Sequence, residues 1–243
     1  MTVRLLRLAA LMALLALAVS AAPLCTQYET LAQYIALGSG GCQIADKLFY
    51  NFTYSSSASS GTGSGVVAPT SAQITVTPDS SDQSQPGMTF TSSGWYVNGS
   101  ATFTKPLFID STISFSVKTL DGAALIVGTL LSDAGQGNVV ITGSGIVQVG
   151  ETVTLPGGNS LTMGVTTNAP ALYTDTDAFA AVSSLTVRKD LLVTVPRPNP
   201  GQTNTGSARV YSFTEKFSEL PEPASMVLFG TGLLGLGVFR RRR

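Results

Sequence analysis

Histidine is missing from all 243 residues of this sequence, and charged residues of both signs make up only 12% of it. Histidine is the commonest general base and metal ligand in proteins. Its absence excludes hydrolases with the usual serine–histidine pair and metal centres built on imidazole. The sequence also has only two cysteines and one tryptophan. We therefore expect a protein that is not an enzyme and has no catalytic residues, metal site or cofactor.

Positive charge is scarce in the middle of the chain, although the formal net charge of the whole is zero. Six of the 14 basic residues lie at the two ends, at Arg4, at Arg7 and in the final run of arginines. The region between them is mildly acidic and contains no cluster of Lys and Arg. Nucleic-acid binding needs such a cluster, so a nucleic-acid partner is excluded.

Residues 1–22 have the three parts of a secretory signal peptide: Arg4 and Arg7, an apolar core at residues 8–19, and small residues up to Ala22. The core is shorter than the roughly 20 residues of a membrane-spanning helix, which disfavours the alternative of an uncleaved N-terminal anchor. Leu24 stands where a small residue would precede a lipid-modified cysteine, which disfavours a lipoprotein. We expect signal peptidase to cleave near Ala22.

Both cysteines, Cys25 and Cys42, follow the expected cleavage site. An isolated pair in an oxidising exported compartment favours a disulfide over two free thiols, and two cysteines without histidine make a poor metal site. Closing this loop would stabilise the fold by roughly 3 kcal/mol in the chain-entropy description. Residues 27–36, inside the loop, carry apolar side chains at helical spacing and predict a short helix fastened by the bridge.

The region from about residue 48 onward predicts an all-β fold. Short runs of β-branched residues alternate with hydroxyl residues and are separated by Gly, Asn, Asp and Pro. An antiparallel β-sandwich is the leading architecture, with jelly-roll and immunoglobulin-like topologies both open. Residues 55–65 are typical of a surface loop. The run 183–195 predicts either two strands or one kinked strand, because Arg188, Lys189 and Asp190 interrupt its apolar pattern. Other expected strands occupy residues 74–77, 101–104, 112–117, 139–142, 151–155 and 208–213.

Four carboxylates are candidates for the pair of acids that hydrolyses a glycosidic bond: Asp110, Asp121, Asp133 and Glu151. Such a pair must face each other in a cleft, about 5 Å apart or somewhat wider. Each candidate instead adjoins Gly, Ser or Thr in what the pattern predicts to be a turn, which favours solvated carboxylates. A carbohydrate-active enzyme remains the first alternative.

Two further acidic clusters, Asp79 with Asp82 and Asp175 with Asp177, offer oxygen ligands of the kind that calcium binds. Calcium takes about six to eight oxygens, and neither cluster completes a loop signature. A calcium-stabilised binding module is therefore the second alternative.

Trp95 and Tyr96 form the candidate ligand-binding site, since adjacent aromatic rings can act as a platform for a sugar. Core packing is the alternative for a lone tryptophan in a strand. Asn51 and Asn98 begin N-glycosylation sequons, which are modified only in a host that has the glycosylation enzymes.

The end of the chain has three consecutive elements. Pro221, Glu222 and Pro223 form a strip that continues neither a helix nor a strand. Residues 226–239 are apolar and would span about 21 Å as a helix, which is shorter than a hydrocarbon layer of ~30 Å. The last element is a cluster of four arginines: Arg240, Arg241, Arg242 and Arg243.

Arginines flanking an apolar segment stay on the cytoplasmic side of a membrane. The leader and the tail therefore mark the same side, and everything between them is exported while the tail stops transiently in the membrane. The alternative, a buried C-terminal helix of the globular domain, is disfavoured because Gly230, Gly232, Gly235 and Gly237 weaken a helix in water.

This ending resembles the PEP-CTERM sorting signal of exported bacterial proteins. The resemblance implies recognition by an exosortase, a membrane cysteine transpeptidase of Gram-negative bacteria, cleavage at or near the Pro-Glu-Pro element, and delivery to the cell surface or extracellular matrix. Residues 34–42, 46–47 and 49–55 are similar to the N-terminal signature of many such proteins, and residues 185–190 resemble a segment before their last strand. Neither similarity carries an assigned activity.

We therefore expect three regions: a signal peptide at 1–22, an exported β-sandwich domain at 23–219 and a sorting signal with a hydrophobic helix at 220–243. The predicted function is that of a non-enzymatic surface or biofilm-matrix protein, whose domain is structural, adhesive or associated with exopolysaccharide. The expected partners are signal peptidase, exosortase, the membrane and, as a candidate, exopolysaccharide. The expected location is the inner membrane transiently, then the cell surface or the exterior.

Overall fold

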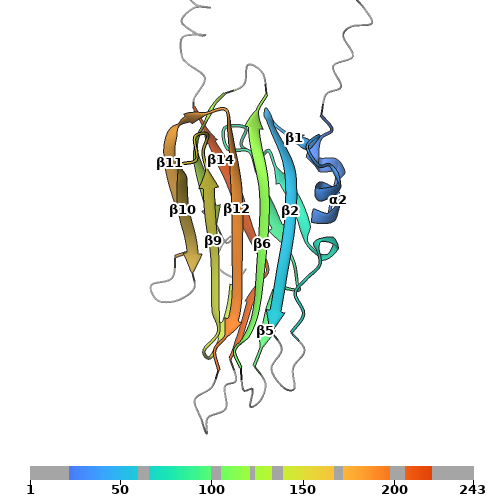
Figure 1. Ribbon diagram of the computed structural model, residues 1–243, viewed down its shortest axis with the longest axis vertical. Coiled ribbons are helices and arrows are strands. Elements are labelled where there is room, and N and C mark those ends of the chain that lie inside the picture. Colours follow the sequence, from blue (N-terminus) through green and yellow to red (C-terminus); the bar gives the residue numbers. More distant parts are fainter. Residues whose placement is uncertain are drawn as a thin grey trace, which may run out of the picture.

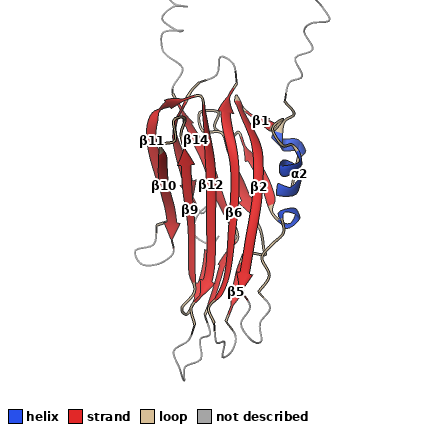
Figure 2. Cartoon of the chain, in the orientation of Figure 1, coloured by secondary structure: helices blue, strands red, loops and turns tan. Residues whose placement is uncertain are grey.

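The computed structural model describes residues 22–59, 66–99, 105–120, 124–132, 139–166, 172–197 and 206–220. This part of the chain is all-β, with three antiparallel sheets and short helical segments beside them, as expected from the sequence (Figures 1 and 2). The six-stranded sheet contains, in spatial order, β1 (Cys42–Ile44), β2 (Lys47–Ser59), β6 (Leu107–Thr119), β12 (Ser184–Val195), β9 (Ile146–Thr154) and β10 (Ser160–Thr166).

The other two sheets complete the fold. The five-stranded sheet contains, in spatial order, β11 (Thr174–Val182), β7 (Ile126–Ser132), β14 (Ser212–Glu219), β4 (Gly87–Thr91) and β3 (Thr75–Asp79). The small three-stranded sheet contains β5 (Tyr96–Asn98), β13 (Ser207–Val210) and β8 (Val139–Thr142).

The two larger sheets pack face to face, which confirms the predicted sandwich-like arrangement. Phe49 of β2 meets Phe217 of β14 with 5.7 Å between ring centres, and Phe115 of β6 meets Phe90 of β4 at 6.0 Å. All four rings are almost completely buried. Offset and edge-to-face aromatic pairs at such distances add to the stabilisation that burial of apolar area provides.

Strand β12 runs without a break and pairs with β6 on one side and β9 on the other. Of the two interpretations of residues 183–195, the single strand is correct. The alternation of inward and outward side chains continues through the charged triplet: Lys189 is buried, whereas Arg188 and Asp190 face solvent. The triplet therefore does not interrupt the strand, and it places one charge inside the sandwich.

Two sequence expectations about strand ends are wrong. The surface loop expected from residue 55 begins later, because Ser55 to Ser59 continue β2 and pair with β6 as far as Phe108. The backbone ladder with β6 overrides the weak strand propensity of serine. The run 208–213 is split at Tyr211 into β13 and β14, which belong to different sheets. Residues 60–65 and 101–104 lie outside the described residues.

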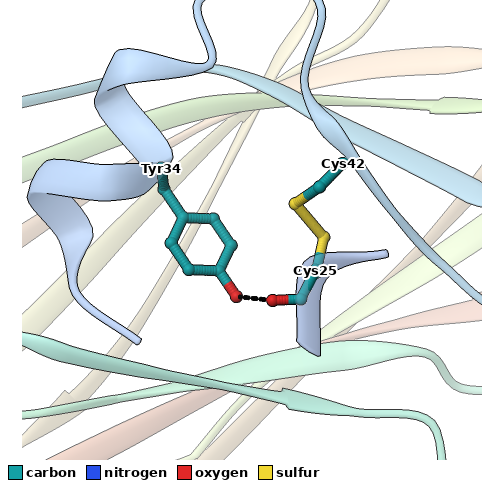
Figure 3. Close-up of a disulfide and its surroundings, with 3 residues drawn as sticks. All are labelled: Cys25, Tyr34 and Cys42. Carbon is teal, nitrogen blue, oxygen red and sulfur yellow. Dashed lines mark hydrogen bonds between the residues drawn. A yellow bond between two sulfur atoms is a disulfide. The ribbon is translucent and has the colours of Figure 1, made fainter. Parts of the chain in front are cut away.

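The predicted disulfide joins Cys25 to Cys42, and both half-cystines are fully buried (Figure 3). The helix between them is shorter than expected: η1 (Cys25–Gln27) is a 3-10 turn, and α2 begins at Leu31 and ends at Ala36. Tyr34 of α2 donates a hydrogen bond of 2.8 Å from its hydroxyl to the backbone carbonyl of Cys25. Burial raises the pKa of Tyr34, so its phenol keeps the proton that this bond needs.

The first and last described parts of the chain lie at the same end of the sandwich. Leu24 forms an isolated bridge with Gln43 of β1. At the start of the adjoining strand, the Nζ of Lys47 lies 2.5 Å from the Oε1 of Glu219 at the end of β14. The first and last described residues of the domain therefore lie at one end of the sandwich.

Candidate functional site

The outer face of the six-stranded sheet carries a hollow of about 440 Å³, which we call the outer hollow. It lies across four consecutive strands, β6, β12, β9 and β10. Its floor forms where Gly150 of β9 pairs with Gly164 of β10 on one side and with Asp190 of β12 on the other. Because neither glycine has a side chain, the backbone is uncovered there. The residues that shape it are Asp110, Gln148, Gly150, Gly164, Thr166 and Asp190.

The two carboxylates of the outer hollow belong to neighbouring strands, with Asp110 opposite Leu192 and Asp190 opposite Thr112. Burial raises the pKa of Asp110, and the charge of Asp190 and a hydrogen bond between the two carboxyl groups raise it further. Thr112 donates a weak hydrogen bond of 3.4 Å to Asp190. The site therefore presents carboxyl oxygens, an amide and a hydroxyl beside bare backbone, a set that suits ligands rich in hydroxyl groups.

Sequence reasoning found Asp110 but missed Asp190. Asp110 was expected to be a solvated turn carboxylate, but it lies within strand β6, where it is only partly exposed. Asp190 was treated as part of an interruption in the strand. Only the register between β6 and β12 shows that the two carboxylates are neighbours.

Glu151 is not a solvated turn carboxylate, and that expectation is wrong. It lies within β9, directly opposite Lys189 of β12, and the side chains of both residues are fully buried. The Nζ of Lys189 donates to Oε2 of Glu151 and to Oε2 of Glu215, which comes from β14 in the facing sheet. The hydroxyl of Thr129 of β7 lies within hydrogen-bond distance of both glutamates, 3.2 Å from Oε1 of Glu151, and can donate its single proton to either one. We call these four residues the buried lysine cluster.

Charge balance in the buried lysine cluster follows from its isolation from water. Burial favours a neutral Lys189, but the charges of Glu151 and Glu215 outweigh burial and raise the pKa of the amine. Burial, followed by the charge of Glu151, raises the pKa of Glu215 well above its ordinary value. Burial thus favours the protonated form of the Glu215 carboxyl, while the two glutamates favour the protonated form of the Lys189 amine. No substrate reaches these groups, because all three charged side chains are fully buried.

The structure does not bring Trp95 and Tyr96 together as a platform. Trp95 is fully buried, with its ring 5.4 Å from that of Phe213. Tyr96 faces the opposite way and is 37% exposed, and the guanidinium of Arg209 lies 4.2 Å from its ring centre. Successive residues of extended backbone point to opposite sides. Core packing therefore describes Trp95, and its assignment as a sugar-binding ring is corrected.

The acidic clusters considered for calcium are already engaged by protein donors. Asp79 accepts hydrogen bonds from Lys216 and Ser81, which lower its pKa to about 2. Asp82 accepts from Ser84, and Asp175 accepts from the backbone N–H of Gly164 at 2.9 Å. Within the described ranges, no three His, Cys, Asp or Glu side chains are grouped so that they could hold a metal ion.

Residues 219–243 match the family model described as the PEP-CTERM protein-sorting motif. The chain is a PEP-CTERM sorting domain-containing protein. The motif implies export, membrane-associated sorting and processing by an exosortase. The matched range includes Pro221, Glu222 and Pro223 and the four terminal arginines, all of which lie outside the described residues, as does the expected sorting helix. In the part of this PEP-CTERM protein that the structure describes, no helix has the length and apolar character to cross a membrane.

No curated protein matches this PEP-CTERM protein. Among solved structures, it is similar to TmCBM61 in complex with beta-1,4-galactotriose, with 10% identity, a TM-score of 0.27 and coverage of 66% of this chain and 86% of that one. It is similar to the enzymatically active domain of tailspike protein 4 of bacteriophage CBA120, with 11% identity, a TM-score of 0.25 and coverage of 68% and 19%. It is also similar to CBM32-3 from a family 31 glycoside hydrolase of Clostridium perfringens, with 12% identity, a TM-score of 0.22 and coverage of 51% and 75%. Similarity at this level establishes neither a shared topology nor a shared function.

Proposed function

We propose that this PEP-CTERM protein is a non-enzymatic component of the cell surface or extracellular matrix, and that its outer hollow binds extracellular polysaccharide. The signal peptide at residues 1–22 directs export, and an exosortase processes the chain at residues 220–243. The domain between them then remains outside the cell as a structural or adhesive module.

The outer hollow is the observation that carries the binding proposal. Its volume of about 440 Å³ falls within the usual range of small-molecule sites. Gly150 and Gly164 leave room for one face of a sugar ring to approach the backbone. Asp110, Asp190 and Gln148 surround that floor with groups that hydrogen-bond to hydroxyls.

Binding is favoured over hydrolysis by how the described carboxylates are arranged. Asp110 and Asp190 lie on the same face of two neighbouring strands, where the charge of Asp190 raises the pKa of Asp110, and not on opposite sides of a cleft. A glycosidase instead needs its two carboxyl groups on opposite sides of that bond, about 5 Å apart or more. Glu151 and Glu215 are also paired, but they lie in the core.

The position of the chain ends also supports the proposal. The contact between Lys47 and Glu219 and the bridge between Leu24 and Gln43 place the first and last described residues at one end of the sandwich. A domain held at that end keeps the face of the six-stranded sheet free for a ligand.

Filling the outer hollow tests the proposal. A Cβ added at Gly150 or Gly164 has its nearest neighbour at 3.7 Å in each case, an ordinary contact, so Gly150→Val and Gly164→Val should fold normally. Each would place two methyl groups over the floor. Thr162→Val is the matched control, because Thr162 faces the same side of β10 and does not line the hollow.

The assay is co-sedimentation of the exported protein with the exopolysaccharide of the producing bacterium. We expect either glycine variant to weaken association by about tenfold or more, which corresponds to roughly 1.4 kcal/mol of lost binding, and the control to bind normally. Wild-type binding by both glycine variants would exclude the outer hollow as the binding site.

A further inference from the structure

The buried lysine cluster has no part in the proposed function, yet it places an amine against two carboxyl groups in the core of the sandwich. Lys189 of β12 reaches Glu151 of its own sheet and Glu215 of the facing sheet. The side chains of all three residues are fully buried, and Thr129 is the one further side chain among the described residues that hydrogen-bonds to them.

We propose that Lys189 and Glu215 join through an amide bond between Nζ and Cδ, formed spontaneously in the folded domain with Glu151 as the catalytic acid and base. The bond would link β12 in the six-stranded sheet to β14 in the five-stranded sheet.

The reaction is a condensation that releases one water molecule and needs no oxidant or cofactor. Lys189 first gives a proton to the carboxylate of Glu151, and the neutral amine then attacks Cδ of the protonated Glu215. The Nζ–Cδ bond forms, and the bond between Cδ and its hydroxyl oxygen breaks. Glu151 protonates the departing hydroxyl and takes the second proton from the nitrogen. Water leaves, Glu151 ends protonated, and the cluster is neutral both before and after the reaction.

The fold supplies the conditions that this condensation needs. Packing holds the amine against the carboxyl group, and such fixed intramolecular pairs react as if each faced a partner at roughly 10⁵ M or more. An ion pair in the core carries a large desolvation cost, which the neutral amide removes. The hydroxyl of Thr129 donates to Glu215 and so polarises the carboxyl group that is attacked.

Glu215, not Glu151, is the acyl partner. A protonated carboxyl group is the electrophile that an amine can attack, and burial together with the charge of Glu151 raises the pKa of Glu215 well above its ordinary value. Glu151, which also contacts the Nζ of Lys189, is the second carboxyl group and can take the proton of the amine. The product suits a protein sorted through its C-terminal end, because β14 ends at Glu219, where the sorting motif begins. Force on that end would meet a covalent link across the sandwich.

We do not expect an amide bond at Lys47, the second buried lysine of the described residues. The Nζ of Lys47 lies 2.6 Å from Oδ1 of Asp46 and 2.5 Å from Oε1 of Glu219, but the side chain of Asp46 is 34% exposed. Contact with water stabilises the ions at that end of the sandwich. Lys47 therefore provides an internal comparison in the same chain.

Peptide mapping by mass spectrometry tests the proposal on the wild-type protein, expressed from the full chain and recovered folded. Trypsin does not cleave after an acylated lysine. We expect the intact protein to be one water lighter than its disulfide-bonded sequence. We also expect a branched peptide that is uncut after Lys189, is cleaved after Arg209, and gives fragment ions that place the link at Glu215. Unmodified Lys189 in the folded protein, or a link from Lys189 to Glu151, would overturn the proposal.

Two variants test the role of Glu151. Glu151→Gln removes the acid–base group and should lower the branched fraction at a fixed time after refolding by about a hundredfold, the scale of general acid–base catalysis. Lys47→Met should leave the branched peptide unchanged. Equal cross-linking in Glu151→Gln and in the wild type would show that Glu151 does not catalyse the reaction. Loss of the branched peptide in Lys47→Met would contradict the assignment of the link to Lys189.

Discussion

The disulfide should contribute a measurable share of the stability of this domain. Cys25 and Cys42 are 17 residues apart in the sequence. In the chain-entropy description, cross-linking at this separation removes about 10 cal/mol/K from the unfolded state, which is roughly 3 kcal/mol at 25 °C. The native contacts around the bridge do not depend on the sulfurs alone, because Tyr34 bonds to the backbone carbonyl of Cys25. Replacing both cysteines with alanine should therefore lower the free energy of unfolding by about 3 kcal/mol.

Urea unfolding of the purified domain, followed by fluorescence of Trp95, measures this loss. With a urea slope near 2 kcal/mol/M, the midpoint should fall by about 1.5 M. A reductant should produce a similar fall in the wild type and none in the double variant, which is the control. Equal midpoints for the wild type and the double variant would refute the argument, because the loop closed by the bridge would then be decoupled from global unfolding.

Three further predictions concern the core and the surface carboxylates. Phe115→Ala should cost about 3 to 5 kcal/mol in denaturant unfolding, because this buried ring meets aromatic rings of both sheets; a loss below about 1 kcal/mol would contradict that packing. Asp110 has a pKa raised above 3.8 in the folded state, so the folded state binds more protons and is destabilised as pH rises through that raised pKa. Asp110→Asn should therefore raise the melting temperature at neutral pH but not below pH 3.8, and equal shifts at both would contradict the assignment. Asp79 is the opposite case: Lys216 lowers its pKa from 3.8 to about 2, so its stabilisation is present above pH 3.8 and is lost as pH falls toward 2. Asp79→Asn should lower the melting temperature at neutral pH and leave it unchanged near pH 2, which thermal scans at the two pH values would check.

The strand-rich fold and the disulfide could be predicted because both depend on local pattern. The alternation of apolar and hydroxyl residues gives each strand one inward face, and β6 follows this alternation from Leu107 to Val117. The export signal and the isolated pair of cysteines were sufficient to predict the disulfide. The end of β2 could not be predicted in the same way, because its serines form a strand only through pairing with β6.

The buried lysine cluster left a signal in the sequence that the prediction did not use. Each charged residue of the cluster is two positions away from buried apolar residues on both sides, and therefore faces the same side of its strand as they do. These neighbours are Val187 and Leu191 for Lys189, Val149 and Val153 for Glu151, and Phe213 and Phe217 for Glu215. A charged residue that alternates in step with the apolar residues of a strand must point inward with them. One lysine and two glutamates at inward-facing positions predict a buried ionic cluster, which the interpretation of these residues as turns or interruptions missed.

The outer hollow could not be predicted, because it depends on long-range register. Gly150 and Gly164 become neighbours only because β9 pairs with β10. Asp110 and Asp190 become neighbours only because β6 pairs with β12. No local pattern encodes these neighbours. The partners of Trp95 are equally distant, because Phe213 lies in a strand far along the chain.

Mass determination on the protein recovered from an exosortase-bearing host most directly tests the claim that this chain is exported and trimmed at both ends. We predict a product that begins close to residue 23, ends at or near Pro221 to Pro223, lacks the four arginines and contains an oxidised Cys25–Cys42 pair. A polypeptide of all 243 residues found in the cytosol, with both thiols reduced, would contradict that claim.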